Sequence, residues 1–218
     1  MHKYRICVSL IENNPAAVKA VEPLVDLFEI RIDLIGMGWR SLVKDIGKPW
    51  IACCRAPDEG GQGDPDAGER IEQLFEAVET GAGIVDIEYR TPDLKNIVSR
   101  FKSKAKCLIS FHDFKSTPPL DKLIEIVDGQ IAAGADLCKV ATTANKFEDN
   151  MTVLELAGRY SHHNIITFAM GEAGWLSRVM SPLCGAYLTY AAASTGKEAA
   201  AGQVAVTDLS KLYGYLIK

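Results

Sequence analysis

The chain has 218 residues, 48% of them hydrophobic and 24% charged, which is the balance of a globular protein with a sizeable core. Its formal net charge of −4 argues against nucleic-acid binding, and no apolar run approaches the roughly 18 residues of a membrane span. The first residues run directly into a strand-like segment without the apolar stretch of a signal peptide, so we expect a cytoplasmic protein.

Short apolar segments alternate with longer amphipathic ones along the chain. The apolar, β-rich runs predict eight strands, at Tyr4–Leu10, Leu27–Leu34, Trp50–Arg55, Ile84–Tyr89, Ala105–Phe111, Asp136–Ala141, Asn164–Met170 and Gly185–Ala191. Apolar residues at i, i+3 and i+4 spacing predict helices at Gly68–Thr80, Asp93–Lys104, Leu120–Ala133, Lys146–Tyr160, around Gly174–Ser181 and at Val206–Ile217.

This alternation favours a closed parallel sheet, because parallel strands need crossovers of a dozen or more residues. Eight such units are the number in a (β/α)8 TIM barrel. An open, doubly wound sheet is the alternative, but it usually has a glycine-rich turn after its first strand, and Ser9–Asn14 contains no glycine. We therefore predict that residues 1–218 form a single-domain barrel of eight parallel strands, without an N-terminal hairpin before the first strand.

The six cysteines form no Cys-x-x-Cys pair, and most lie within apolar, strand-like runs. Metal clusters and disulfide frameworks usually show tighter or paired spacing. We therefore expect buried, reduced thiols and no metal site.

Several predicted strands carry polar residues near their carboxyl ends, although strands buried on both faces are usually apolar. These residues are Glu29, Arg31, Asp33, Arg55, Asp86, Glu88, His112 and Lys139. The carboxyl ends of barrel strands meet at one mouth, where the active sites of this fold are found. We therefore expect the polar side chains to converge on one pocket.

Two of these residues suggest a chemistry. Lys139 lies in an apolar strand, so its amine should be partly desolvated, with a lowered pKa, and nucleophilic toward a carbonyl. His112 directly follows the preceding strand, and a histidine with a pKa near the working pH can remove the proton that an imine acidifies. Loss of a β-hydroxyl would then give dehydration, and cleavage of a C–C bond would give an aldolase. Both outcomes stay open from these residues.

Each polar residue also has a structural interpretation. Lys139 can be an edge lysine with its head in water, and His112 a satisfied core histidine. Glu29 and Arg31 can form a salt bridge at the barrel rim. Asp86 and Glu88 can belong to a buried network. Two further histidines, at 162 and 163, precede the seventh strand at the opposite end of the barrel, and we assign them no role.

Taken in order, the motifs resemble the type I 3-dehydroquinate dehydratase family. They are Glu29-Ile30-Arg31-Ile32-Asp33, Arg55 with Glu59-Gly60-Gly61, Ser110-Phe111-His112-Asp113-Phe114, Lys139-Val140-Ala141, Met170-Gly171 with Ser177-Arg178, and Gly202-Gln203. The resemblance spans almost the whole chain. It implies a (β/α)8 barrel, often a homodimer, which acts in the shikimate route to aromatic amino acids without a metal or an organic cofactor.

The resemblance also implies a role for each matching residue. Lys139 would form an imine with the C3 ketone of 3-dehydroquinate, and His112 would take a proton from C2 and help the C1 hydroxyl leave as water. Glu59 would orient His112, and Arg178 would bind the substrate carboxylate. Further substrate contacts would come from Ser9, Glu29, Arg31, Arg55, Met170 and Gln203.

The segment Ser194–Gln203 matches a lid that closes over the site. The family commonly has a serine four residues before the glutamine, where this chain has Ala199. One hydroxyl contact to the substrate is then missing, or a backbone group of the lid replaces it.

Two other functions stay open. A class I aldolase would need a phosphate site in the loops after strands seven and eight, where Glu172 would oppose an anion. A barrel that binds sugar acids without turnover is the non-enzymatic alternative, but it would have no use for a nucleophilic amine at Lys139.

Overall fold

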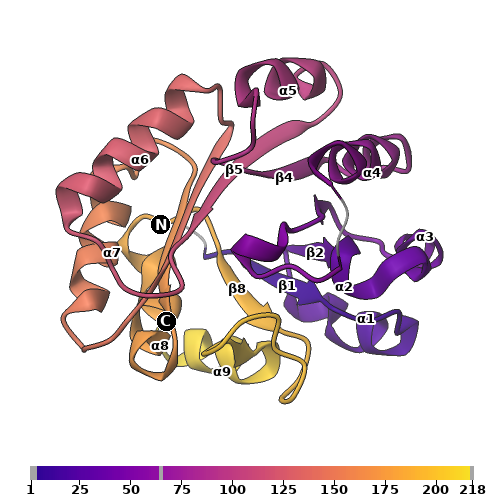
Figure 1. Cartoon of the computed structure of the whole chain (residues 1–218). Helices are drawn as coiled ribbons and strands as arrows, with labels where there is room; N and C mark the ends of the chain where they lie inside the picture. Colours follow the sequence, from indigo (N-terminus) through magenta and orange to yellow (C-terminus); the bar gives the residue numbers. More distant parts are fainter. Residues whose placement is uncertain (1–3, 64–65, 217–218) are drawn as a thin grey trace.

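The computed structural model describes residues 4–63 and 66–216, whose strands form a parallel sheet that curls into a barrel (Figure 1). The strands are β1 (Ile6–Leu10), β2 (Leu27–Arg31), β3 (Trp50–Cys53), β4 (Ile84–Glu88), β5 (Lys106–His112), β6 (Leu137–Thr143), β7 (Ile165–Met170), β8 (Thr189–Ala192) and β9 (Val204–Ala205). Their order is β7-β6-β5-β4-β3-β2-β1-β8-β9. The predicted barrel of eight parallel strands is confirmed, with a short ninth strand added.

Helices surround this sheet (Figure 1). They are α1 (Pro15–Val21), α2 (Ile32–Ile35), α3 (Trp39–Leu42), α4 (Ala67–Glu79), α5 (Leu94–Phe101), α6 (Leu120–Ala132), α7 (Asp149–Arg159), α8 (Trp175–Met180) and α9 (Val206–Leu216). The six predicted helices correspond to α4 through α9, with their ends shifted by up to three residues. Ile217, the predicted end of the last helix, lies outside the described residues.

The three short helices α1, α2 and α3 were not predicted from the sequence. A local signal for α1 was available, because the Asn14 side chain accepts a hydrogen bond from the backbone N–H of Ala17 (3.1 Å) and Pro15 is the first helical residue. The two helices α2 and α3 have four residues each, too few to show a helical period.

Three strand boundaries differ from the prediction, and the first two affect the site. The second strand ends at Arg31 rather than Leu34, because Ile32–Ile35 forms α2. The third ends at Cys53, which places Arg55 in the loop that follows it. The eighth begins at Thr189 rather than Gly185, because Gly185 has a φ of 111° and ends a 3₁₀ turn.

The barrel wall between β7 and β8 is completed by the segment that follows β8. Among the described residues no ladder joins these two strands. Near their amino ends, the backbone N–H of Tyr187 donates to the carbonyl of Ile165 (2.6 Å). At the carboxyl end, the N–H of Gly171 donates to the carbonyl of Ala201 (3.2 Å), and the chain then enters β9, which pairs with β8.

The barrel interior has an apolar lower layer and a polar layer above it. The lower layer is formed by Leu27, Ile51, Leu108, Leu137, Ile166 and Leu188, all buried. Because alternate strand residues share a face, the residues two positions further along the strands also point inward. These are Glu29, Cys53, Ser110, Lys139, Phe168 and Tyr190, also buried. The packed lower layer therefore supports a polar layer that faces the carboxyl ends of the strands.

Three smaller expectations concern the rest of the chain. All six cysteines are free, and only Cys184 is not fully buried, as expected for reduced thiols. Within the described residues no hairpin precedes β1, and Tyr4 packs against Tyr213 of α9 with ring centroids 4.3 Å apart. Among the described helices, none has the length and apolar character needed to cross a membrane.

Candidate active site

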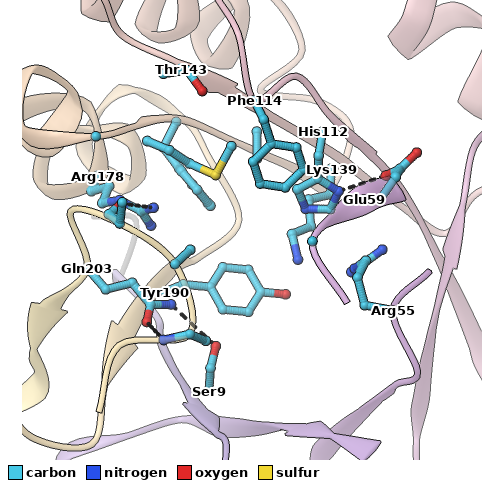
Figure 2. A pocket seen from close by; sticks show the side chains of 18 of the residues that line it. Ser9, Arg55, Glu59, His112, Phe114, Lys139, Thr143, Arg178, Tyr190 and Gln203 are labelled. Carbon is cyan, nitrogen blue, oxygen red and sulfur yellow. Dashed lines mark hydrogen bonds and ion pairs between the residues drawn. The ribbon is translucent and has the colours of Figure 1, made fainter. Parts of the chain in front are cut away.

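The ten site residues expected from the sequence line a single pocket at the carboxyl ends of the strands (Figure 2). They are Ser9, Glu29, Arg31, Arg55, Glu59, His112, Lys139, Met170, Arg178 and Gln203. All are buried except Gln203, which is half-buried. The strands therefore bring together residues that lie up to 194 positions apart in the chain.

Lys139 lies between two carboxylates. Its Nζ is 3.3 Å from Oε1 of Glu29 and 3.2 Å from Oδ2 of Asp86, and the face of the Tyr190 ring is 4.3 Å away. Burial lowers the pKa of Lys139, but Glu29 and Asp86 outweigh it and raise the pKa above its usual value. The expected lowered pKa is therefore wrong, and the amine rests as an ion-paired ammonium.

A buried network fixes one of these carboxylates. Arg55 donates to Oδ2 of Asp86 (2.5 Å) and to the hydroxyl of Ser110 (2.6 Å), and Ser110 donates to the other oxygen of Asp86 (2.6 Å). Burial opposes ionisation of Asp86, but Arg55 and Lys139 hold its pKa well below the usual range. Glu88 accepts from Arg55 (3.4 Å). The structural interpretation of Asp86 and Glu88 as network members is confirmed, and Asp86 also contacts Lys139.

Glu29 links Lys139 to the segment after β8. Its Oε2 accepts a hydrogen bond from the Ser9 hydroxyl (2.8 Å), and Nε2 of Gln203 lies 3.5 Å from that hydroxyl. A salt bridge between Glu29 and Arg31 does not form. Arg31 instead donates twice to Asp33 of α2 (2.9 and 2.7 Å).

Glu59 and His112 form a direct hydrogen-bonded pair, drawn as a dashed line in Figure 2. The distance from Nδ1 of His112 to Oε2 of Glu59 is 2.9 Å. Glu59 ends a 3₁₀ turn closed by Gly60, whose φ is 83°. A side chain at Gly61 would place its Cβ 1.9 Å from the carbonyl oxygen of Arg55, so this turn requires a glycine there.

The pocket keeps His112 neutral. Burial, together with the positive charges of Arg55 and Lys139, lowers the pKa of His112 well below its usual value. Burial also raises the pKa of Glu59 to about 7, against the opposing effect of Arg55. The expectation of a histidine pKa near the working pH is therefore corrected downward, and the neutral imidazole is ready to accept a proton.

Arg178 is a buried cation without a carboxylate partner among the described residues. Its Nη2 donates to the carbonyl of Ala201 (3.1 Å), and its guanidinium carbon lies 4.3 Å from the Phe168 ring centroid. Its Nε and Nη1 have no hydrogen-bond partner in the described chain. Burial lowers the pKa of Arg178 to about 9. Because a buried charge is costly without a partner, this guanidinium is suited to an anionic ligand.

The segment Ser194–Gln203 lies over the pocket, and Ala199, Ala200 and Ala201 are part of its lining. The backbone N–H of Ala199 donates to Oε1 of Gln203 (2.7 Å). Position 199 therefore orients Gln203 through its backbone. The segment is also tied to the loop after β1, because Lys197 is 2.5 Å from Glu12.

The aromatic side chains that line the pocket were not predicted from the sequence. Tyr190 and Phe168 point inward from β8 and β7, and Phe114 stacks on His112 with ring centroids 6.0 Å apart. In a strand, such residues look like ordinary core. The two histidines without an assigned role, at 162 and 163, are exposed just before β7.

A parallel barrel with a buried lysine, a neutral histidine and an arginine lacking a carboxylate in one pocket has the layout of an enzyme with a small-molecule site. Comparisons with known proteins agree. The family model described as type I 3-dehydroquinase matches residues 6–218. The chain belongs to this family.

Individual relatives are similar over most of their length. A 3-dehydroquinate dehydratase of Dehalococcoides mccartyi is 39% identical over 186 residues, which cover 85% of this chain and 84% of the relative. One of Methanocaldococcus jannaschii is 36% identical over 216 residues, covering 95% and 97%. The crystal structure of a type I 3-dehydroquinate dehydratase from Clostridium difficile has a TM-score of 0.87 at 25% identity, covering 99% and 94%.

Proposed function

We propose that this chain is a 3-dehydroquinate dehydratase of the shikimate pathway, which converts 3-dehydroquinate to 3-dehydroshikimate through an imine on Lys139. The observation that carries the proposal is one pocket holding Lys139, neutral His112 and the partnerless guanidinium of Arg178. These groups fit the ketone, the acidic C–H bond and the carboxylate of this substrate. We take residues 1–218 as the catalytic domain.

Binding places the two ends of the substrate. The carboxylate pairs with the free N–H groups of Arg178, and Gln203, held by Ala199, contacts it or a neighbouring hydroxyl. The other hydroxyls meet the charged groups of Glu29, Arg31 and Arg55, while Ser9 and Met170 complete the wall. The segment Ser194–Gln203 acts as the lid that excludes water.

The chemistry follows from the charge states. Lys139 gives up a proton to neutral His112 or to a neighbouring carboxylate, and the free amine attacks the C3 ketone. The same proton is then returned to the hydroxyl of this adduct, which leaves as water, so that an iminium forms and His112 is neutral again. The iminium withdraws electrons, so His112 removes a proton from C2 and the C1 hydroxyl leaves as water with a proton from His112. Hydrolysis of the imine then releases the product and the lysine. Glu59 orients His112 throughout.

An aldolase has less support. The relatives named above are all 3-dehydroquinate dehydratases. The loop that would hold a phosphate presents Glu172, which is exposed and negatively charged. The reaction needs no metal or organic cofactor, since Lys139 supplies the electron sink.

The assembly and the location belong to the same proposal. We infer a cytoplasmic homodimer that binds neither nucleic acid nor membrane, from the resemblance to the family and the net charge of −4. Sedimentation velocity at micromolar concentration tests the dimer, and a single species with the mass of one chain would contradict it.

The imine is tested by trapping. The protein is incubated with 3-dehydroquinate, reduced with borohydride and digested, and the added mass is located by peptide mapping. We expect it on Lys139, and we expect none in a Lys139→Met variant. Trapping at another lysine, or none in the unchanged protein, would overturn the mechanism.

Replacing His112 with alanine should slow turnover by about 10²–10⁴-fold.

A further inference from the structure

Glu59 has two carboxylate oxygens, and each has its own partner. Oε2 contacts Nδ1 of His112 (2.9 Å), and Oε1 is 3.4 Å from Nη1 of Arg90. Arg90 follows β4 by two residues. Its guanidinium lies over the ring of Phe111, 4.6 Å from the ring centroid, and its side chain is 53% exposed, whereas Glu59 is buried. The arginine therefore reaches from the surface to the far side of the Glu59–His112 pair.

The charges around this pair come from several strands. Around Glu59 lie Arg55 after β3, Asp86 and Glu88 on β4, and Arg90. Around His112 lie Arg31, Arg55, Asp86 and Lys139. Arg55 is hydrogen-bonded to Asp86, Glu88 and Ser110, and Arg31 to Asp33. Among the described residues, Arg90 is the cation that forms an ion pair with Glu59.

The protonation state of Glu59 decides the tautomer of His112. An ionised Glu59 accepts a hydrogen bond from Nδ1–H of the neutral imidazole, and Nε2 keeps its lone pair for the pocket. A protonated Glu59 donates a hydrogen bond to Nδ1, so the neutral imidazole carries its proton on Nε2. The Nε2 atom then cannot act as a base toward the pocket. Because Arg55 and Lys139 disfavour a charged His112, an added proton goes to Glu59.

We propose that Arg90 is a positioning residue that holds Glu59 as a carboxylate and thereby keeps the proton of neutral His112 on Nδ1. The opposing influence is burial, which raises the pKa of Glu59 to about 7. Arg90 acts without touching the substrate, and its role in turnover rests on the proposed function. Its effect on the tautomer does not.

The test uses the ligand-free protein. Long-range ¹H–¹⁵N spectra report which ring nitrogen of His112 carries the proton, and they are recorded from pH 5 to 9 for the unchanged protein, Arg90→Gln and Arg90→Lys. The pH at which His112 changes tautomer should rise by about half a unit in Arg90→Gln, because an exposed arginine is partly screened by solvent. It should stay close to the original value in Arg90→Lys.

The chain offers a matched control in Arg100. Arg100 lies on α5, outside the pocket, and its side chain is also 53% exposed. It pairs with Glu72 (3.6 Å), and its guanidinium lies 4.3 Å from the Phe75 ring centroid. Arg100→Gln should leave the tautomer change where it was. If Arg90→Gln titrates like the unchanged protein, or if Arg100→Gln shifts it as much, Arg90 has no such role.

A kinetic measurement then connects the tautomer to catalysis. The acid limb of the kcat profile should move to higher pH in Arg90→Gln by the same amount as the tautomer change, with kcat at pH 9 and KM altered less than twofold. A shift in the spectra with an unmoved kcat profile would remove Arg90 from the reaction. If neither the unchanged protein nor any variant turns over 3-dehydroquinate, but the spectral shift is present, the proposed function is rejected and the positioning role of Arg90 remains.

Discussion

Lys139 illustrates how a single residue's chemistry depends on neighbours that are distant in sequence. An apolar strand predicts a desolvated amine with a lowered pKa, yet Glu29 and Asp86 lie close enough to reverse the direction. The burial of this amine could be predicted from its strand. Its resting charge could not, because it depends on distances across the barrel.

Arg178 should contribute to substrate binding but not to the stability of the ligand-free protein. Replacing it with leucine removes Nε and Nη1, the two nitrogens that have no protein partner, so kcat/KM should fall by at least about 100-fold, as for the loss of charge-assisted hydrogen bonds. The free energy of unfolding of the ligand-free protein should change by less than about 1 kcal/mol or rise, because the buried cation lacks an anion. Steady-state kinetics and urea unfolding measure the two effects. An unchanged kcat/KM would contradict the assignment.

Glu59 links stability to pH. Its pKa is raised to about 7 in the folded state, so the folded protein binds the proton more tightly than the unfolded chain does. Stability from this group is full below about pH 4.5 and is lost as the pH rises through 7. Glu59→Gln should therefore gain stability relative to the unchanged protein between pH 5 and pH 8, by at most about 3 kcal/mol. The difference between their unfolding free energies, measured across that range, checks the sign. A flat difference would reject it.

Among the elements, the segment after β8 depends on one glycine at its contact with β7. Gly202 has a φ of 77°, and a Cβ there would lie 2.5 Å from the carbonyl oxygen of Gly171. Gly202→Ala should raise KM by about tenfold, because the displaced segment no longer supports Arg178 and Gln203, and should cost about 1–2 kcal/mol of stability.

Gly196→Ala is the control for this prediction. Its φ of 82° imposes a similar backbone strain, but nothing lies within 4 Å of the added Cβ. It should lose a comparable amount of stability with KM nearly unchanged. Equal effects of the two variants on KM would mean that strain, rather than the contact with Gly171, controls the site.

The shortest helices could not be predicted from the sequence pattern. The eight strands follow from apolar, β-rich runs and the six predicted helices from 3.6-residue patterns, whereas α2 and α3, with four residues each, are too short to show a period. The ten candidate site residues were predicted correctly as one cluster, because strand ends of a barrel converge. Tyr190 was missed since an aromatic residue in a strand gives no polar signal. Arg90 was missed because it lies on the surface side of Glu59.

For the whole molecule, the layered interior separates stability from activity. Leu137 belongs to the apolar lower layer, two residues before Lys139 on β6. Leu137→Ala should lower the free energy of unfolding by about 2–5 kcal/mol, as is typical of buried leucines, while kcat per folded molecule changes less than about twofold.

Ser110 lies in the polar layer and supplies the comparison. Ser110→Ala removes the hydroxyl that bridges Arg55 and Asp86, so kcat should fall more than in Leu137→Ala, with a smaller loss of stability. Chemical unfolding and active-site titration together separate the two quantities. If kcat fell more in Leu137→Ala than in Ser110→Ala, the lower layer would not serve stability alone.

The ion pairs of Lys139 affect its reactivity toward other carbonyl compounds in the cell. Aldehydes and ketones of many kinds diffuse through a cell, and an exposed, uncharged amine would condense with them indiscriminately. In this enzyme the resting Lys139 is a charged ammonium paired with Glu29 and Asp86. A charged ammonium has no free lone pair, so it does not attack such carbonyl compounds. We therefore expect that a carbonyl compound reacts with this nitrogen only where the rest of the pocket binds it and the ion pairs with Glu29 and Asp86 are broken.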